Sequence, residues 1–197
     1  TNVVRFARAA GIKSPLEAVP SLCLGTADLT VLEMTGSYAT FANSGVHIEP
    51  FFISRIEDRN GNVLASFGGE PNRATDPKTA FKVVELLRGV VDEGTASRLR
   101  YEYNFTNEIG GKTGTTQNHS DGWFIGITPN LVSGVWVGCS DRRMHFPTMK
   151  NGQGAIMALP IWAKYMKGVY EDEVLEFPQE RFKRPRMYYT EFNCGES

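Results

Sequence analysis

Residues 110–127 read GGKTGTTQNHSDGWFIGI, a glycine-rich polar stretch followed by an apolar one. Glycine weakens a strand interior because it offers no side chain to pack and gives up much backbone entropy. Glycines at 110, 111 and 114 therefore indicate that another backbone comes close to this strand. An extended peptide pairing with the strand edge would satisfy that pattern.

Three strands are expected in this part of the chain, joined by short turns. They run over Ile109–Thr116, Gly122–Thr128 and Leu131–Cys139. Short connections favour antiparallel neighbours, because a parallel pair needs a crossover of a dozen or more residues.

The flanking segments carry helix and hairpin signals. Thr30 and Glu33 have the spacing of a capping box, and Asp76-Pro77 places an N-cap before proline at the first helical position. Asn60-Gly61 favours a tight turn between two strand-like runs. The expected helices span about 3–10, 31–42, 77–93 and 154–170, and the expected hairpin joins 51–57 to 63–67. This order of elements predicts an α+β fold, an antiparallel sheet packed with helices.

Pro160 interrupts the expected closing helix, so it must either kink that helix or mark its true start. The apolar positions of the helix are expected to face inward: Ile161, Trp162, Tyr165, Met166 and Val169. Trp123 and Trp136 are likewise expected to anchor the core.

Composition excludes several function classes. The net charge is −1 and the basic residues are scattered, which argues against nucleic acid as a partner. No apolar run approaches the length of a membrane span. The three cysteines have no metal-ligand spacing, and Cys23 and Cys139 are expected to be buried among apolar neighbours. No metal site is therefore expected.

Lys112-Thr113-Gly114 combines a cation, a hydroxyl and a residue without a side chain. Under strand alternation Thr113 and Thr115 share one face, while Lys112 and Gly114 share the other. Both kinds of group can meet one anionic ligand only if the flexible lysine reaches round the strand. His119 is expected to be an exposed loop residue, in a loop that could also border a ligand cleft, and Asp121 is expected to fix the turn before its strand. Gly94-Thr95-Ala96 is expected chiefly to end a helix, with lining of such a cleft as the alternative.

Several motifs in one order carry a resemblance to a known family. Residues 111–116, 121–126 and 135–138 look like the third signature of the penicillin-binding transpeptidases and the two strands that follow it. Residues 20–26 and 38–45 resemble the class A, bifunctional penicillin-binding proteins in particular. The similarity runs from about residue 1 to residue 170, and it implies the C-terminal portion of a β-lactamase-like transpeptidase fold, with 171–197 as an extension.

The resemblance implies a role for each residue of the signature. Lys112 would hydrogen-bond toward a serine of the family's second signature and add positive potential. Thr113, Gly114 and Thr116 would bind the substrate, and the Thr113 and Thr115 hydroxyls would hold its carboxylate. The Thr115 backbone N–H would be one oxyanion-hole donor.

The sequence contains neither Ser-x-x-Lys nor Ser-x-Asn, the family's other two signatures. Both are expected upstream in a parent protein, together with a glycosyltransferase region and a membrane anchor. The isolated chain is therefore expected to be inactive and, because part of its sheet would lack its normal cover, to self-associate.

The implied reaction is serine acyl transfer between peptidoglycan stem peptides, which β-lactams would mimic, with no cofactor. The implied location is the cell inner membrane, with the catalytic domain in the periplasm. Two alternatives stay open: a serine β-lactamase or D,D-carboxypeptidase, and a non-catalytic module that binds cell-wall peptide or a protein through a strand edge.

Overall fold

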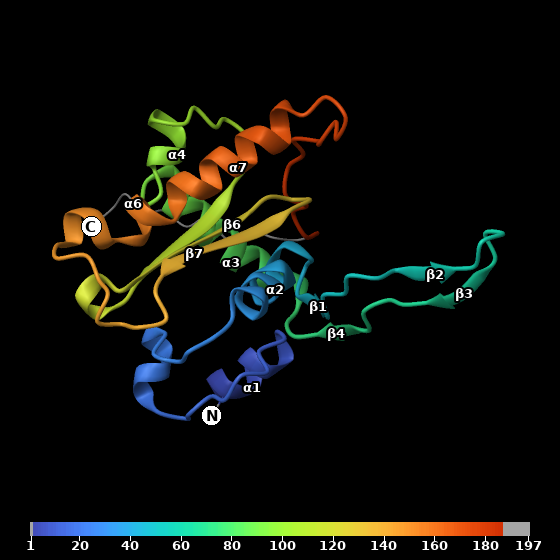
Figure 1. Ribbon diagram of the computed structural model, residues 1–197, viewed down its shortest axis with the longest axis horizontal. Helices are drawn as coiled ribbons and strands as arrows, with labels where there is room; N and C mark the ends of the chain where they lie inside the picture. Colours follow the sequence, from blue (N-terminus) through green and yellow to red (C-terminus); the bar gives the residue numbers. More distant parts are fainter. Residues whose placement is uncertain (1, 187–197) are drawn as a thin grey trace.

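Three antiparallel strands lie at the centre of the computed structural model, which describes residues 2–186 (Figure 1). In spatial order they are β5 (Gly110–Thr115), β6 (Asp121–Ile127) and β7 (Val132–Gly138). Their bounds lie within one residue of those expected, and the α+β class is confirmed. Because β5 pairs with β6 alone among the described strands, it is an edge strand.

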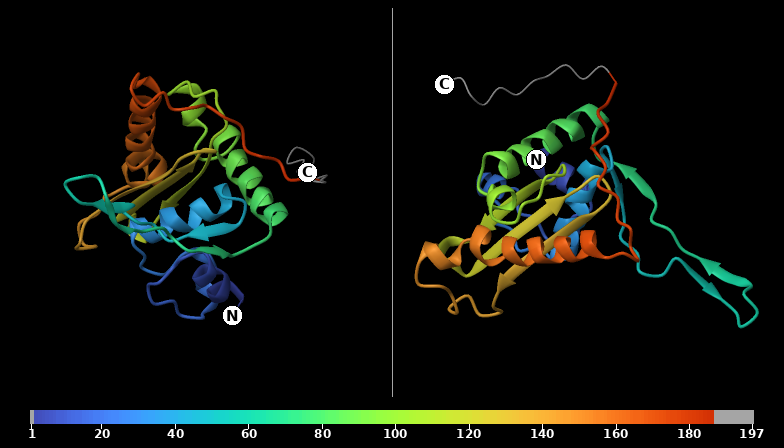
Figure 2. Two further views of the ribbon diagram at one scale, coloured as in Figure 1. Left: turned by 90° about the vertical axis from the view of Figure 1, so that its right-hand side faces the viewer. Right: turned by 90° about the horizontal axis from the view of Figure 1, so that it is seen from above.

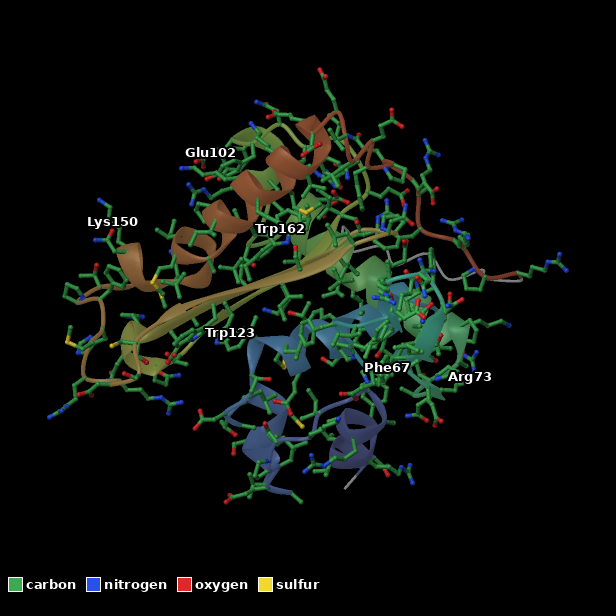
Figure 3. All side chains as sticks on the ribbon, turned by 45° about the vertical axis from the view of Figure 1, so that its right-hand side comes forward. Phe67, Arg73, Glu102, Trp123, Lys150 and Trp162 are labelled. Carbon is green, nitrogen blue, oxygen red and sulfur yellow. The ribbon has the colours of Figure 1, made fainter. Side chains whose placement is uncertain are left out.

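Helices cover both faces of this sheet. On one face, the Phe124 ring packs edge-on against Trp162 of α7 (Leu159–Glu171), with 5.3 Å between ring centroids. On the other face, β7 approaches α2 (Val31–Ala42) so closely that a Cβ on Gly134 would lie 2.3 Å from the Thr35 hydroxyl oxygen. Figure 3 shows Trp162 and Trp123 on opposite sides of the sheet.

The core lies chiefly between the sheet, α7 and α3 (Pro77–Asp92). Its largest members are fully buried: Leu99, Ile109, Phe124, Leu159, Trp162 and Met166. A second cluster joins Val84 and Leu87 of α3 to Ile127 of β6. These contacts hold α3 along β5, which positions the strand that carries the lysine signature.

The two predicted helix starts are confirmed. Thr30 accepts a hydrogen bond from the Glu33 backbone, and the Glu33 carboxylate accepts one from the Thr30 backbone, which completes the capping box of α2. Asp76 caps α3 through the backbone N–H groups of Lys78 and Thr79.

Glu33 also ties the N-terminal loop to α2, which leads to a pH-dependent prediction. Burial would raise the pKa of Glu33, but hydrogen bonds from Ser14 and Thr30 outweigh it and lower the pKa to about 2. A carboxyl whose pKa is depressed by folding stabilises the fold above its unfolded pKa and loses that contribution as pH falls. We expect Glu33→Gln to reduce the free energy of unfolding by about 1 kcal/mol at pH 7.

The difference between Glu33→Gln and the unsubstituted chain is expected to shrink between about pH 5 and pH 2. Urea denaturation at a series of pH values measures it, with the exposed Glu17→Gln as control. A difference that stays constant from pH 7 to pH 2 would contradict this account of Glu33.

The closing helix is divided in two. α6 (Gly154–Met157) precedes α7, and Pro160 lies in the first turn of α7, so it marks a helix start. Trp162, Met166 and Val169 face inward as expected. Ile161 and Tyr165 do not, because they lie on the outer side of the helical wheel and are 50% and 52% exposed.

An arm projects from the body of the molecule (Figures 1 and 2). Its outer part is the expected hairpin, β2 (Arg55–Glu57) paired with β3 (Val63–Ser66), but residues 51–54 do not belong to its first strand as expected. Phe52 and Leu64 are 89% and 67% exposed. Its base is a pair that was not expected, β1 (Val46–Ile48) with β4 (Pro71–Arg73). Three-residue strands, one of them beginning with proline, are too short to show a periodic pattern.

The remaining elements are short. They are α1 (Asn2–Ala9), the 3₁₀ helices η1 (Pro20–Leu24) and η2 (Gln117–His119), α4 (Arg98–Tyr101) and α5 (Met149–Gly152). After α7 the chain returns across the fold, where the Phe182 N–H donates to Glu108 and the Arg184 guanidinium lies 6.0 Å from the Phe81 ring. Within residues 2–186, every helix is too short or too polar to cross a membrane.

Candidate functional site

Lys112 lies at the exposed end of β5. Its Nζ donates a hydrogen bond of 2.7 Å to the Thr113 carbonyl oxygen, and it has no ion pair with any carboxylate among residues 2–186. Lys112 pairs with Ile125 of β6, on the face that α2 covers. An ammonium without an anionic partner at a strand edge is suited to attract an anionic ligand.

The two threonines share the opposite face of the strand, as the alternation predicted. Thr113 pairs with Phe124, and Thr115 pairs with Gly122. The Thr115 hydroxyl accepts a 3.0 Å hydrogen bond from the Gly154 N–H at the start of α6. Its hydrogen is left available for another acceptor.

The Thr113 hydroxyl oxygen lies 2.9 Å from that of Thr95. Thr95 follows α3 and precedes α4, and it was expected chiefly to end a helix. The sequence signal was a glycine-threonine pair after a helix, which indicates a turn but says nothing about a strand 18 residues further on. The sequence thus favoured a helix end for Thr95, with cleft lining as the alternative, and the structure brings the Thr95 hydroxyl to β5.

The glycines of β5 serve a different purpose from the one expected. Gly110 and Gly111 are buried, and side chains there would press against Leu87 of α3 and the Phe124 ring, the latter at 2.7 Å. They make room for the protein's own core. Gly114 is half-buried, and a Cβ there would lie 3.1 Å from the Trp123 Cβ, on the face opposite to Thr113 and Thr115.

A polar network fixes the turn between β5 and β6. Thr116 and Ser120 donate to one Asp121 carboxylate oxygen, and the Trp136 indole N–H donates to the other. Burial would raise the pKa of Asp121, but these hydrogen bonds outweigh it and lower the pKa below its usual value. The structural role expected of Asp121 is confirmed, and the Thr116 hydroxyl takes part in the same network.

Three expectations outside β5 need correction. Cys23 and Cys139 are exposed, because one lies in a surface 3₁₀ helix and the other follows the end of a strand. Trp136 is 39% exposed and Trp123 half-buried, so they pack on each other at the sheet surface. His119 is half-buried rather than exposed.

The remaining histidines lie outside this site. His47 is buried, with Nε2 3.8 Å from a Glu49 oxygen, and His145 is exposed. In the described part of the chain, no three His, Cys, Asp or Glu side chains are grouped to hold a metal ion.

The model of a protein family, the penicillin binding protein transpeptidase domain, matches residues 10–139. Penicillin-binding protein 1A of Aquifex aeolicus is 43% identical over 164 residues, which cover 81% of this chain and 22% of the relative. Penicillin-binding protein 2D of Bacillus subtilis is 33% identical over 190 residues, 94% of this chain and 26% of that protein. The chain thus spans about a quarter of the length of these relatives.

Solved structures of two proteins have a fold similar to that of this chain. Penicillin-binding protein 1A from Haemophilus influenzae has a TM-score of 0.78 and 25% identity, covering 94% of this chain and 34% of that one. The PonA1 protein from Mycobacterium tuberculosis in complex with penicillin V has a TM-score of 0.73 and 25% identity, covering 94% and 53%. This chain therefore belongs to the transpeptidase domain family of the class A penicillin-binding proteins.

Proposed function

We propose that this chain is the C-terminal portion of a D,D-transpeptidase domain in a parent protein that cross-links peptidoglycan stem peptides and binds β-lactams. The observation that supports this is the exposed part of the edge strand β5, where Lys112 lies on one face and Thr113 and Thr115 on the other, and where Lys112 has no carboxylate partner among the described residues. Residues 1–170 belong to this domain, and 171–197 form its extension.

In this proposal the reaction is acyl transfer in two steps. A serine hydroxyl of the parent attacks the carbonyl of the stem peptide's D-Ala-D-Ala bond, and D-alanine leaves with a proton. The amine of a neighbouring peptide then attacks the acyl-enzyme and releases the serine. A β-lactam forms the same acyl-enzyme by opening its ring.

The residues of β5 have separate roles in that reaction. The Lys112 ammonium stabilises negative charge at the nucleophile end of the cleft, and the Thr113 and Thr115 hydroxyls bind the ligand carboxylate. Gly114 leaves space for the ligand backbone, Thr116 completes the wall, and the Thr115 N–H donates to the oxyanion. The relatives named above are penicillin-binding proteins, which favours this function over that of a β-lactamase.

The rest of the parent follows from the same resemblance. We infer that it carries a glycosyltransferase region and a membrane anchor, and that the transpeptidase domain works in the periplasm at the inner membrane.

Fluorescent penicillin tests the proposal. The complete parent protein is expected to take up a covalent label that resists denaturing electrophoresis, and an excess of unlabelled penicillin should prevent it. The 197-residue chain alone is expected to take up none, because it contains no Ser-x-x-Lys. A parent protein that takes up no label would overturn the proposed function. A label on the 197-residue chain alone would overturn the proposal that the nucleophile lies outside it.

The isolated chain is expected to self-associate. The arm exposes large apolar side chains and β7 has no further strand beside it among the described residues, and both features favour association. Sedimentation velocity at increasing concentration is expected to show a rising sedimentation coefficient. A single monomeric species at all concentrations would contradict this.

A further inference from the structure

A pair of hydroxyls connects β5 to the turn after α3. Thr95 Oγ1 and Thr113 Oγ1 are 2.9 Å apart, 18 residues apart in the chain, and the Thr95 side chain is exposed. Thr95 therefore reaches the candidate carboxylate site without belonging to the lysine signature.

The backbone that carries Thr95 is held firmly on both sides. Before it, Gly94 lies so close to Val90 that an added Cβ would be 2.8 Å from the Val90 Cα. After it, Ala96 and Leu99 are fully buried in the core. Because this backbone is closely packed, it fixes the position of the exposed Thr95 side chain.

A contact from α4, the helix directly after this turn, reaches the helix that supports Thr115. The Arg98 guanidinium donates a 2.9 Å hydrogen bond to the Ala155 carbonyl oxygen of α6, and Gly154 of α6 donates to Thr115. The turn, α6 and β5 thus form one connected unit, with both candidate hydroxyls held by neighbouring elements.

The number of hydroxyl hydrogens determines which threonine donates in the bond between Thr95 and Thr113. Each threonine hydroxyl has one hydrogen to donate and two lone pairs to accept with. If Thr113 gives its hydrogen to a ligand carboxylate, the bond between the two threonines must use the hydrogen of Thr95. A hydroxyl that accepts a hydrogen bond is also a stronger donor, so Thr95 strengthens the contact from Thr113 to the ligand.

We propose that Thr95 is a positioning residue for carboxylate recognition: its hydroxyl donates to Thr113 and thereby orients the Thr113 hydrogen toward the carboxylate of a stem peptide or β-lactam. The proposal rests on the function proposed above. It adds a specificity-determining residue from outside the strand that carries the signature.

The test uses the complete parent protein and two probes, benzylpenicillin and its methyl ester, which lacks the negative charge. Thr95→Val is expected to lower the second-order acylation rate constant for benzylpenicillin about tenfold. The rate constant for the ester is expected to stay about the same, because the ester gives Thr113 no carboxylate to bind. Thr95→Ser keeps the hydroxyl and should restore the rate with benzylpenicillin.

Thr106→Val, at an exposed threonine outside the site, serves as the control and should leave both rate constants unchanged. Three results would overturn the role of Thr95. They are an equal loss of rate with benzylpenicillin and its ester, no loss of rate with either probe, and failure of Thr95→Ser to restore the rate with benzylpenicillin. Acylation of the unsubstituted parent distinguishes failure of the proposed function from failure of the role of Thr95 alone. If the parent is not acylated, the proposed function fails and this inference fails with it, whereas an acylated parent with an unaffected Thr95→Val variant overturns the inference alone.

Discussion

Replacing Lys112 by alanine is expected to slow the acylation of the complete parent protein by penicillin about a hundredfold or more. The ammonium makes one hydrogen bond, to the Thr113 carbonyl, and pairs with no carboxylate among the described residues. Its charge is therefore available to the reacting groups. Removing it leaves the negative charge that develops in the reaction without the stabilisation of this cation. Stopped-flow measurement of the second-order rate constant with fluorescent penicillin gives the effect.

Two further variants make this result specific. Lys164→Ala removes the same charge from the exposed side of α7, so it should leave the rate constant unchanged. Lys112→Arg keeps the charge but spreads it over a planar group with different donor directions, so it is expected to restore little of the rate. A Lys112→Ala variant that is acylated as fast as the unsubstituted protein would remove the main support for the proposed site.

Local signals explain why so much of the fold could be predicted. The starts of α2 and α3 follow from side chains that bond to backbone groups two or three residues away, at Thr30 and Asp76. The three strands are long enough to show their alternation, and their short turns leave antiparallel pairing as the simple solution. The lysine signature was recognisable for the same reason, because its residues are consecutive.

Contacts between distant segments explain what could not be predicted. The partners of the two threonine hydroxyls lie 18 and 39 residues away, at Thr95 and Gly154. The glycines at 110 and 111 carry a signal for close approach, but the sequence does not say whether a ligand or the protein's own helix comes close. Only tertiary packing distinguishes the two, and here it is Leu87 and the Phe124 ring that fill the space.

Gly154→Ala is expected to damage the fold and the site together. The added Cβ would lie 2.4 Å from the carbonyl oxygens of both Gly114 and Trp123, which are backbone atoms of paired strands and have little freedom to move. Helix α6 must therefore shift away from the sheet, which breaks the hydrogen bond from Gly154 to Thr115. We expect the free energy of unfolding to fall by about 2–3 kcal/mol. Acylation of the complete parent should slow as Thr115 loses its support.

Gly168→Ala provides the matched control, because a Cβ on Gly168 of α7 meets no atom within 4 Å. Alanine is the better helix former, so this variant should be unchanged or more stable by up to about 1 kcal/mol. Urea denaturation of the two variants compares a blocked glycine with an open one in neighbouring helices. Gly154→Ala could instead prove as stable as Gly168→Ala and be acylated at the unsubstituted rate. A shift of α6 large enough to admit the methyl group would then have left the site intact. That result would contradict the role of α6 in holding the Thr115 end of β5.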